Sequence, residues 1–206
     1  MPFTVVLNGC DITPKPVDLD VRERLKISPE TFLFVFVGNI NKNKNQVQVV
    51  DAMRLFSEAK RARIGVVFVG GGDVEYLNQY IANNGLSSSM WAMGAVPKWE
   101  VHNYYAAANA SVLTSLSEGF GLSIIEGYIY GLPTVTFRDL GAYEDICTDT
   151  TSIGVPERSD SALAKGMEEC MSRSWDHKEI RRFGQMFGNE AMRDRYLALY
   201  EQIIRK

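Results

Sequence analysis

Two glutamates flank a glycine-rich turn in the middle of the chain. Glu118 directly precedes Gly119-Phe120-Gly121, and Glu126 follows eight positions after Glu118 in a stretch with helical spacing of apolar residues. A loop that leads into a helix N-terminus offers unpaired backbone N–H groups, which favour an anion such as phosphate. Carboxylates on either side accept hydrogen bonds from hydroxyl groups. A phosphate flanked by polyol rings is the outline of a nucleotide sugar, and the segment favours such a ligand.

The elements around the turn must position these groups. Residues 111–114 form a short β-branched run that predicts a buried strand, and residues 122–130 predict a helix closed by Gly131 and Pro133. The alternative is that both glutamates face solvent and the glycines only make a turn, which is the common state of a single glutamate. The apolar helix around Glu126 favours a functional role.

The whole chain alternates between the two kinds of element. The expected strands are 32–37, 66–69, 90–93, 111–114 and 134–137, and the expected helices lie near 45–60, 74–83, 98–107, 122–130, 160–173 and 178–204. Near-continuous apolar strands separated by helices predict an α/β fold, a Rossmann-like doubly wound parallel sheet with helices on both faces. Ligands of such sheets bind beyond the carboxyl ends of the strands.

Other loops at this edge also carry candidate residues. Gly38 and Asn39 follow the first strand and lead to Lys42 and Lys44, two point charges that suit a diphosphate, although a solvated polar loop is the alternative. The 70–73 glycine turn is weak as a dinucleotide or P-loop signal. The backbone at Met93 and Gly94 could seat the edge of a flat base.

Composition bounds the remaining functions. The chain has 206 residues, 46% hydrophobic and 23% charged, with a net charge of −3, so neither nucleic acid nor an anionic membrane is expected as a partner. Three widely spaced cysteines favour a reducing, cytoplasmic setting. No signal peptide or transmembrane run is present in the sequence. Motifs for a metal site or a Ser/Cys nucleophile are missing, and both histidines, His102 and His177, are expected to be surface or structural.

Together these segments resemble a known family. The Glu118-to-Glu126 pattern, the hinge-like Asn8-Gly9-Cys10-Asp11, the turns at 68–72 and 131–133, and the closing 195–200 segment are similar to the C-terminal domain of the retaining glycosyltransferases of family 4 (group 1). The resemblance covers essentially the whole chain. It implies one half of a GT-B fold, which has two Rossmann-like domains.

The resemblance also implies roles for individual residues. Glu118, the catalytic candidate, would face the hydroxyls of the donor sugar, Glu126 would bind the ribose, and Lys44 would bind phosphate without a required metal or other cofactor. The family places an arginine where this chain has Asn39, and Lys42 is the candidate substitute. The donor-binding set is completed by the N–H groups of Phe120, Gly121 and Leu122 and by Gly38, Met93 and Gly94.

These observations lead to one hypothesis with two alternatives. Residues 1–30 would form an interdomain hinge and lead-in, 31–175 the nucleotide-sugar-binding domain, and 176–206 a helical segment that packs on it or reaches toward a missing N-terminal domain. The function would be hexosyl transfer from a nucleoside diphosphate sugar to an acceptor held by that missing domain. The isolated fragment would be inactive, and the full-length protein would be cytoplasmic or peripheral to the membrane. The alternatives are a non-catalytic nucleotide-sugar-binding domain, which Asn39 favours, and a GT-B nucleotide-sugar epimerase.

Overall fold

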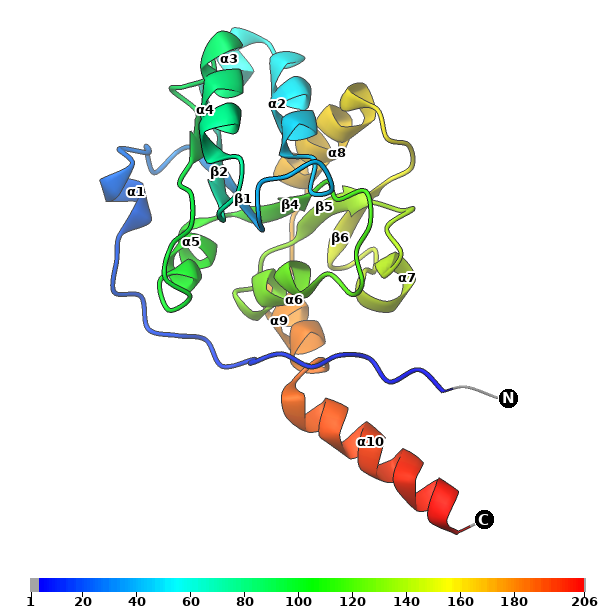
Figure 1. The fold of residues 1–206 in the computed structure, drawn as a ribbon. Helices are drawn as coiled ribbons and strands as arrows, with labels where there is room; N and C mark the ends of the chain where they lie inside the picture. The colour runs from blue at the N-terminus through cyan, green and yellow to red at the C-terminus, as the bar shows by residue number, and fades with distance from the viewer. Residues whose placement is uncertain (1–3, 206) are drawn as a thin grey trace.

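The computed structural model describes residues 4–205, and its centre is one parallel sheet of six strands (Figure 1). The strand order β3-β2-β1-β4-β5-β6 is that of a Rossmann-like, doubly wound sheet. The strands are β1 (Phe32–Val37), β2 (Ile64–Val69), β3 (Met90–Ala92), β4 (Ala110–Leu113), β5 (Thr134–Phe137) and β6 (Ser152–Val155). The five strands expected from the sequence are all present, and the predicted fold class is confirmed.

Helices cover both faces of the sheet. Helices α2 (Gln46–Arg54), α4 (Val74–Asn83) and α8 (Asp160–Ser172) lie on one face, whereas α5 (Val101–Ala107), α6 (Leu122–Ile129) and α9 (His177–Gln185) lie on the other (Figure 1). The remaining helices are α1 (Val21–Arg24), α3 (Glu58–Arg61), α7 (Tyr143–Ile146) and α10 (Asn189–Ile204). The apolar strands are buried from both sides, which is why they read as continuous hydrophobic runs.

The register of the central strands fixes where the ligand loops lie. Strands β1 and β2 pair along their whole length, ending at Val37 opposite Val69. Strand β4 pairs with the other side of β1, with Ala110 opposite Phe34. The chain therefore reverses its direction of winding between β1 and β4, which is the switch point where such sheets bind ligands. The loops after β1 and β4 begin side by side there.

The glycine turn after β2 has a structural cause. A Cβ atom at Gly70 would lie 2.1 Å from the carbonyl oxygen of Gly38, and one at Gly72 would lie 2.3 Å from that of Ile40. Gly72 also has a φ of +103°, which L side chains rarely adopt. These glycines allow the β1–α2 and β2–α4 loops to pack backbone against backbone.

Several element boundaries differ from the sequence prediction. The helix expected over 45–60 is two helices, α2 and α3, because Phe56 turns into the core between them at 7% exposure. The helix expected over 178–204 is also two, because Gly188 is extended and forms a bridge with Cys10. Helix α5 begins at Val101, three residues later than expected. The sixth strand, β6, was not predicted, because Gly154 interrupts its apolar run.

The C-terminal helices differ in their packing. Helix α9 packs against α6 with Ile180 fully buried, whereas α10 has no buried residue and extends away from the sheet (Figure 1). None of the helices in residues 4–205 combines the length and apolar content needed to span a bilayer. The three cysteines are free thiols.

Candidate functional site

The loops after β1 and β4 bring a lysine and a glutamate together. The ammonium group of Lys44 donates to Oε1 of Glu118, 74 residues away in sequence, and the Ser115 hydroxyl donates to the same oxygen at 2.6 Å. The two charged side chains are mostly buried, at 20% and 12% exposure. Two residues predicted for one site from separate motifs therefore lie in direct contact.

Backbone and hydroxyl contacts fasten the two loops to each other. The backbone N–H of Leu116 donates to the Asn43 carbonyl at 2.7 Å, and the Asn43 side-chain amide donates to the Ser117 carbonyl at 3.0 Å. The Thr114 hydroxyl lies 3.0 Å from the Lys44 carbonyl and 2.8 Å from the Asn45 carbonyl. The Lys44–Glu118 pair is therefore held by its backbone as well as by charge.

The turn that follows Glu118 presents free backbone donors. Gly121, with φ +81°, is the N-cap of α6 and leaves no side chain to cap the helix. The Phe120 ring is buried against Phe187, with ring centroids 6.0 Å apart. Within the described protein, the N–H groups of Phe120, Gly121 and Leu122 donate to no acceptor. Three orphan donors at a helix N-terminus can hold an anion.

The Lys44 side chain crosses directly over the start of the β1–α2 loop. A Cβ atom at Gly38 would be 3.4 Å from Lys44 Cε and 3.8 Å from Nζ. The Lys44 side chain therefore packs against the backbone of Gly38 at van der Waals distance.

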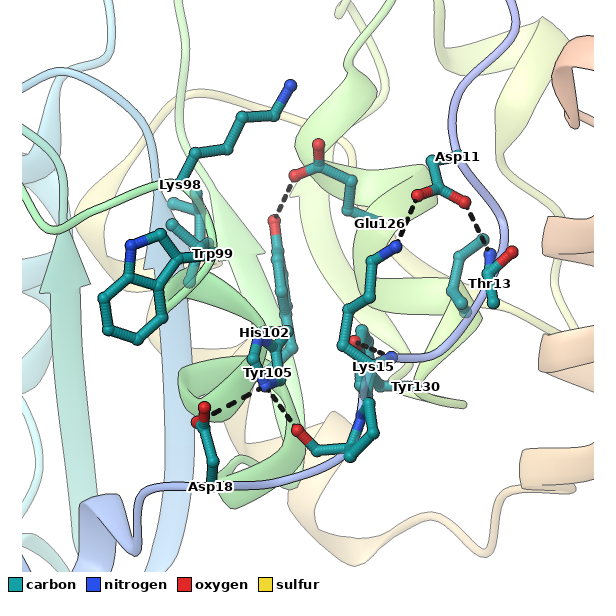
Figure 2. Close-up of a pocket in the computed structure, with 14 residues that line it drawn as sticks. Asp11, Thr13, Lys15, Asp18, Lys98, Trp99, His102, Tyr105, Glu126 and Tyr130 are labelled. Carbon is teal, nitrogen blue, oxygen red and sulfur yellow. Dashed lines mark hydrogen bonds and ion pairs between the residues drawn. The ribbon is translucent and has the colours of Figure 1, made fainter.

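Glu126 belongs to a neighbouring part of the same sheet edge. It lies on α6 and accepts a hydrogen bond of 3.0 Å from the Tyr105 hydroxyl of α5 (Figure 2). Burial raises the pKa of the Glu126 carboxyl group, while the Tyr105 hydrogen bond and the positive charge of Lys98 act in the opposite direction. Burial also raises the pKa of Tyr105 well above its ordinary value, so that residue stays a hydroxyl donor.

Glu126 lines a cavity of about 850 Å³ between α5, α6 and the lead-in segment 11–18. Figure 2 shows Trp99 on one side of Tyr105 and Glu126, and Asp11 and Lys15 on the other. The volume is in the range of small-molecule sites. Further lining residues are Val37, Lys98, His102 and Tyr130.

The lead-in segment is tied to this cavity by specific contacts. His102 Nε2 lies 2.7 Å from the Pro16 carbonyl, and the backbone N–H of Lys15 donates to the Tyr130 hydroxyl at 3.1 Å. The Asn103 side-chain amide accepts a hydrogen bond from the Asp18 backbone N–H and donates one to the Asp18 carboxylate. His102 is therefore structural, as expected. The sequence analysis missed Tyr105, Lys98 and Tyr130, whose only signal was their place in the helices expected over 98–107 and 122–130.

Other predicted residues make contacts of their own. Lys42 lines a second cavity of about 530 Å³ with Asp73 and Tyr76, and neither Lys44 nor Glu118 lines it. Asn39 is exposed, and its carbonyl accepts a hydrogen bond from Gln46. Met93 packs against the core, and the Gly94 carbonyl accepts from the Gly70 N–H at 2.9 Å. The site therefore divides into an anion region around Lys44 and a cavity around Glu126.

No group of three or more metal-ligating side chains comes together in the described part of the chain. The polar groups present are instead of three kinds: the Lys44 ammonium group and three backbone N–H groups, which donate, and two carboxylates, which accept. This set can neutralise an anion and accept hydrogen bonds from neutral hydroxyls. The geometry therefore matches a ligand that combines phosphate with polyol groups.

Comparison with known proteins agrees with this chemistry. The profile of the family "Glycosyl transferases group 1" matches residues 18–186. O-antigen chain mannosyltransferase C of Escherichia coli is 27% identical over 162 residues, which cover 73% of this chain and 43% of that protein. O-antigen chain mannosyltransferase B of the same organism is 26% identical over 129 residues.

Solved structures share the fold. A glycosyltransferase from Rickettsia africae superposes with a TM-score of 0.82 at 19% identity, covering 98% of this chain and 57% of the other. Anabaena Alr3699/HepE in complex with UDP-glucose superposes with a TM-score of 0.80 at 19% identity, covering 97% and 57%. The chain thus spans about half the length of the proteins it matches. By its profile match and its sheet, the chain belongs to the group 1 glycosyl transferases and has the Rossmann-like fold of a GT-B domain.

Proposed function

We propose that this chain is the donor-binding half of a retaining glycosyltransferase, which moves a hexosyl group from a nucleoside diphosphate sugar to an acceptor. The family membership supports glycosyl transfer as the reaction class. The Anabaena protein of the same fold is solved with UDP-glucose, which supports a nucleotide sugar as the ligand class. Transfer would require acceptor-binding residues contributed by another domain, and the isolated chain would bind donor without turnover.

The observation that carries the proposal is the Lys44–Glu118 pair beside the orphan N–H groups at the start of α6. A lysine ammonium group has three donors, so Lys44 can contact a phosphate oxygen while it keeps Glu118. Lys44 and the helix N-terminus would stabilise the negative charge that develops on the leaving diphosphate. Glu118 would accept hydrogen bonds from the sugar hydroxyls. No metal is needed for this arrangement.

The second region would hold the nucleoside. Glu126 would accept hydrogen bonds from the ribose hydroxyls while Tyr105 holds its other oxygen in place. A charged acceptor of this kind contributes about 1.5–3 kcal/mol per hydrogen bond. The cavity bordered by Trp99 and Lys98 is large enough for the remainder of a nucleoside.

A second candidate function is nucleotide-sugar binding without transfer. The observation that favours it is Asn39, a neutral and exposed residue at the position of the family arginine. One fewer cation near the diphosphate would weaken charge stabilisation in the transition state more than it weakens ground-state binding. Release of nucleoside diphosphate by the full-length gene product in the presence of saccharide acceptors separates the two, since a binding module shows saturable binding and no release.

Calorimetry of this 206-residue chain tests the donor site directly. The probes are three pairs: UDP and UDP-glucose, GDP and GDP-mannose, and ADP and ADP-glucose. We expect saturable binding of at least one pair, weakened roughly tenfold or more by Lys44→Ala, because a charge-assisted contact to phosphate is lost. Lys60→Ala is the matched control, since Lys60 also pairs with a glutamate, Glu168, but on the surface. Absence of binding by all six probes would contradict the proposal.

A further inference from the structure

Arg158 lies in the loop between β6 and α8 and reaches across to the loop that carries Glu118. Its guanidinium donates to the Ser115 carbonyl at 2.9 Å and to the Thr114 carbonyl at 3.3 Å. Thr114 and Ser115 are at most 1% exposed, so these carbonyls have little access to solvent. The arginine therefore supplies hydrogen bonds that water cannot.

The guanidinium is itself fixed from two sides. Its Nε donates to the Asp139 carboxylate at 2.7 Å, and its central carbon lies 4.6 Å from the centroid of the buried Phe137 ring. The Arg158 side chain is 22% exposed. A planar group that is stacked and paired in this way presents its remaining donors in a fixed direction. Lysine cannot reproduce this geometry.

Two hydrogen bonds meet on the peptide group between Ser115 and Leu116. Arg158 holds the carbonyl of the peptide between Ser115 and Leu116, and the Asn43 carbonyl accepts the N–H of that same peptide at 2.7 Å. The Ser115 hydroxyl then donates to Glu118 at 2.6 Å. The β4–α6 loop is thus held between the β1–α2 loop and Arg158. Ser115, the residue that Arg158 holds, is also the residue that donates to the Glu118 carboxylate.

We propose that Arg158 is a positioning residue that holds Glu118 in the orientation required for a donor sugar. This inference rests on the proposed function for the role of Glu118, but the hold of Arg158 on the loop is itself a property of the ligand-free chain. Arg158 acts through Ser115 and its peptide, and among the described residues it donates no hydrogen bond to Glu118 itself.

The first test compares a nucleotide sugar with its nucleoside diphosphate. For the pair that the wild-type chain binds, the dissociation constant of the nucleoside diphosphate is divided by that of the nucleotide sugar. This ratio measures what the sugar contributes to binding. Glu118→Gln should lower this ratio by about tenfold, the size of one charge-assisted hydrogen bond. Arg158→Ala should lower it several-fold and leave the affinity for the nucleoside diphosphate within about twofold, because phosphate contacts come from Lys44 and α6.

A double-mutant cycle separates positioning from general stability. If Arg158 acts through Glu118, adding Arg158→Ala to Glu118→Gln should change the ratio no further. Arg173→Ala is the matched control, because Arg173 also stacks on an aromatic ring, that of Trp175 at 4.5 Å, and donates to a backbone carbonyl, that of Asp149 at 2.6 Å. That variant should lose stability and keep the wild-type ratio. Independent, additive effects of the two substitutions would overturn the proposal.

Amide hydrogen exchange of the ligand-free chain gives a readout that does not depend on the proposed function. Arg158→Ala should accelerate exchange of the Leu116 amide selectively, and Arg173→Ala should not. Arg158→Lys serves if the alanine variant does not fold, and it should give a smaller change in the same direction. Unchanged protection of Leu116 in the Arg158 variants would overturn the inference even if nucleotide sugars bind, whereas failure of the wild-type chain to bind any probe would count against the proposed function alone.

Discussion

At the scale of single residues, opposing influences act on the pKa of Glu126. Its burial between α5 and α6 favours the neutral acid, whereas the Tyr105 hydroxyl and Lys98 favour the carboxylate. Burial is the largest influence, and the pKa therefore lies above the ordinary value of 4.5. A folded-state pKa above the unfolded one means that ionised Glu126 opposes folding, and that this cost disappears as pH falls through the raised pKa.

Replacing Glu126 by glutamine should separate binding from stability. We expect Glu126→Gln to weaken nucleoside diphosphate binding about tenfold at neutral pH, since a charged acceptor for hydroxyls is lost. The same change should raise the melting temperature at neutral pH, because it removes the cost of burying a charge, and this gain should shrink as the pH is lowered toward the raised pKa. Calorimetry and thermal unfolding across a pH series provide the measurements. A variant less stable than wild type at neutral pH would contradict the assignment.

The residues of the site were predictable to different degrees. Lys44 and Glu118 stand out because each follows a strand at the edge where ligands bind, and the structure brings their side chains into contact. Arg158 and Tyr105 gave no such signal, because a lone arginine or tyrosine has many surface or core uses and its partners are far away in sequence. Lys42 was grouped with Lys44 by sequence proximity, yet the loop turns it toward another cavity.

At the scale of elements, glycines set how closely the ligand loops approach. Gly70→Ala should destabilise the chain by about 2–4 kcal/mol, because its Cβ would lie 2.1 Å from the Gly38 carbonyl oxygen and the loops would have to separate. Chemical denaturation measures the change. Gly119→Ala is the control for stability, since nothing lies within 4 Å of a Cβ there, and we expect a change within about 1 kcal/mol. Equal effects of the two substitutions would contradict this account of the loop packing.

Local sequence patterns predicted which segments form strands and which form helices, but they did not predict where these elements end. The central strands are apolar on both faces, so their composition alone predicted them. Strand β6 contains Gly154, which weakens the signal of its apolar run, and it forms because β5 offers a pairing edge. The helices expected over 45–60 and 178–204 are each interrupted at a residue that makes a tertiary contact. These residues are the buried Phe56 and Gly188, which forms a bridge with Cys10. Such contacts are invisible in a local window.

At the scale of the whole molecule, the topology assembles a site from distant segments. Residues from the lead-in, from the loops after β1 and β4, and from α5 and α6 meet at one edge because parallel strands place all their carboxyl ends there. The lead-in segment 11–18 is hydrogen-bonded to His102 of α5 and to Tyr130 at the end of α6, and it forms one wall of the cavity. Helix α9 then returns the chain to α6. Helix α10 stands outside this arrangement.

The exposure of α10 leads to a prediction about its contribution to folding. Its apolar side chains are largely exposed, among them Tyr200 at 56% and Ile203 at 61%. A chain ending at Met192 keeps the contacts of Gly9 and Cys10 with the start of α10, and we expect its melting temperature to lie within about 2 °C of the full chain. Light scattering should show less self-association after the exposed apolar surface is removed.

A shorter chain provides the contrast. Ending the chain at Asp176 also removes α9, whose Ile180 is fully buried, together with Phe187, which is 3% exposed against Phe120. Loss of two such side chains from the core costs several kcal/mol, because cavities remain where they packed, and cooperative unfolding near physiological temperature should be lost. A large loss of stability already at the Met192 end point would instead mean that α10 packs against the domain, and its apolar side chains would then belong to the core.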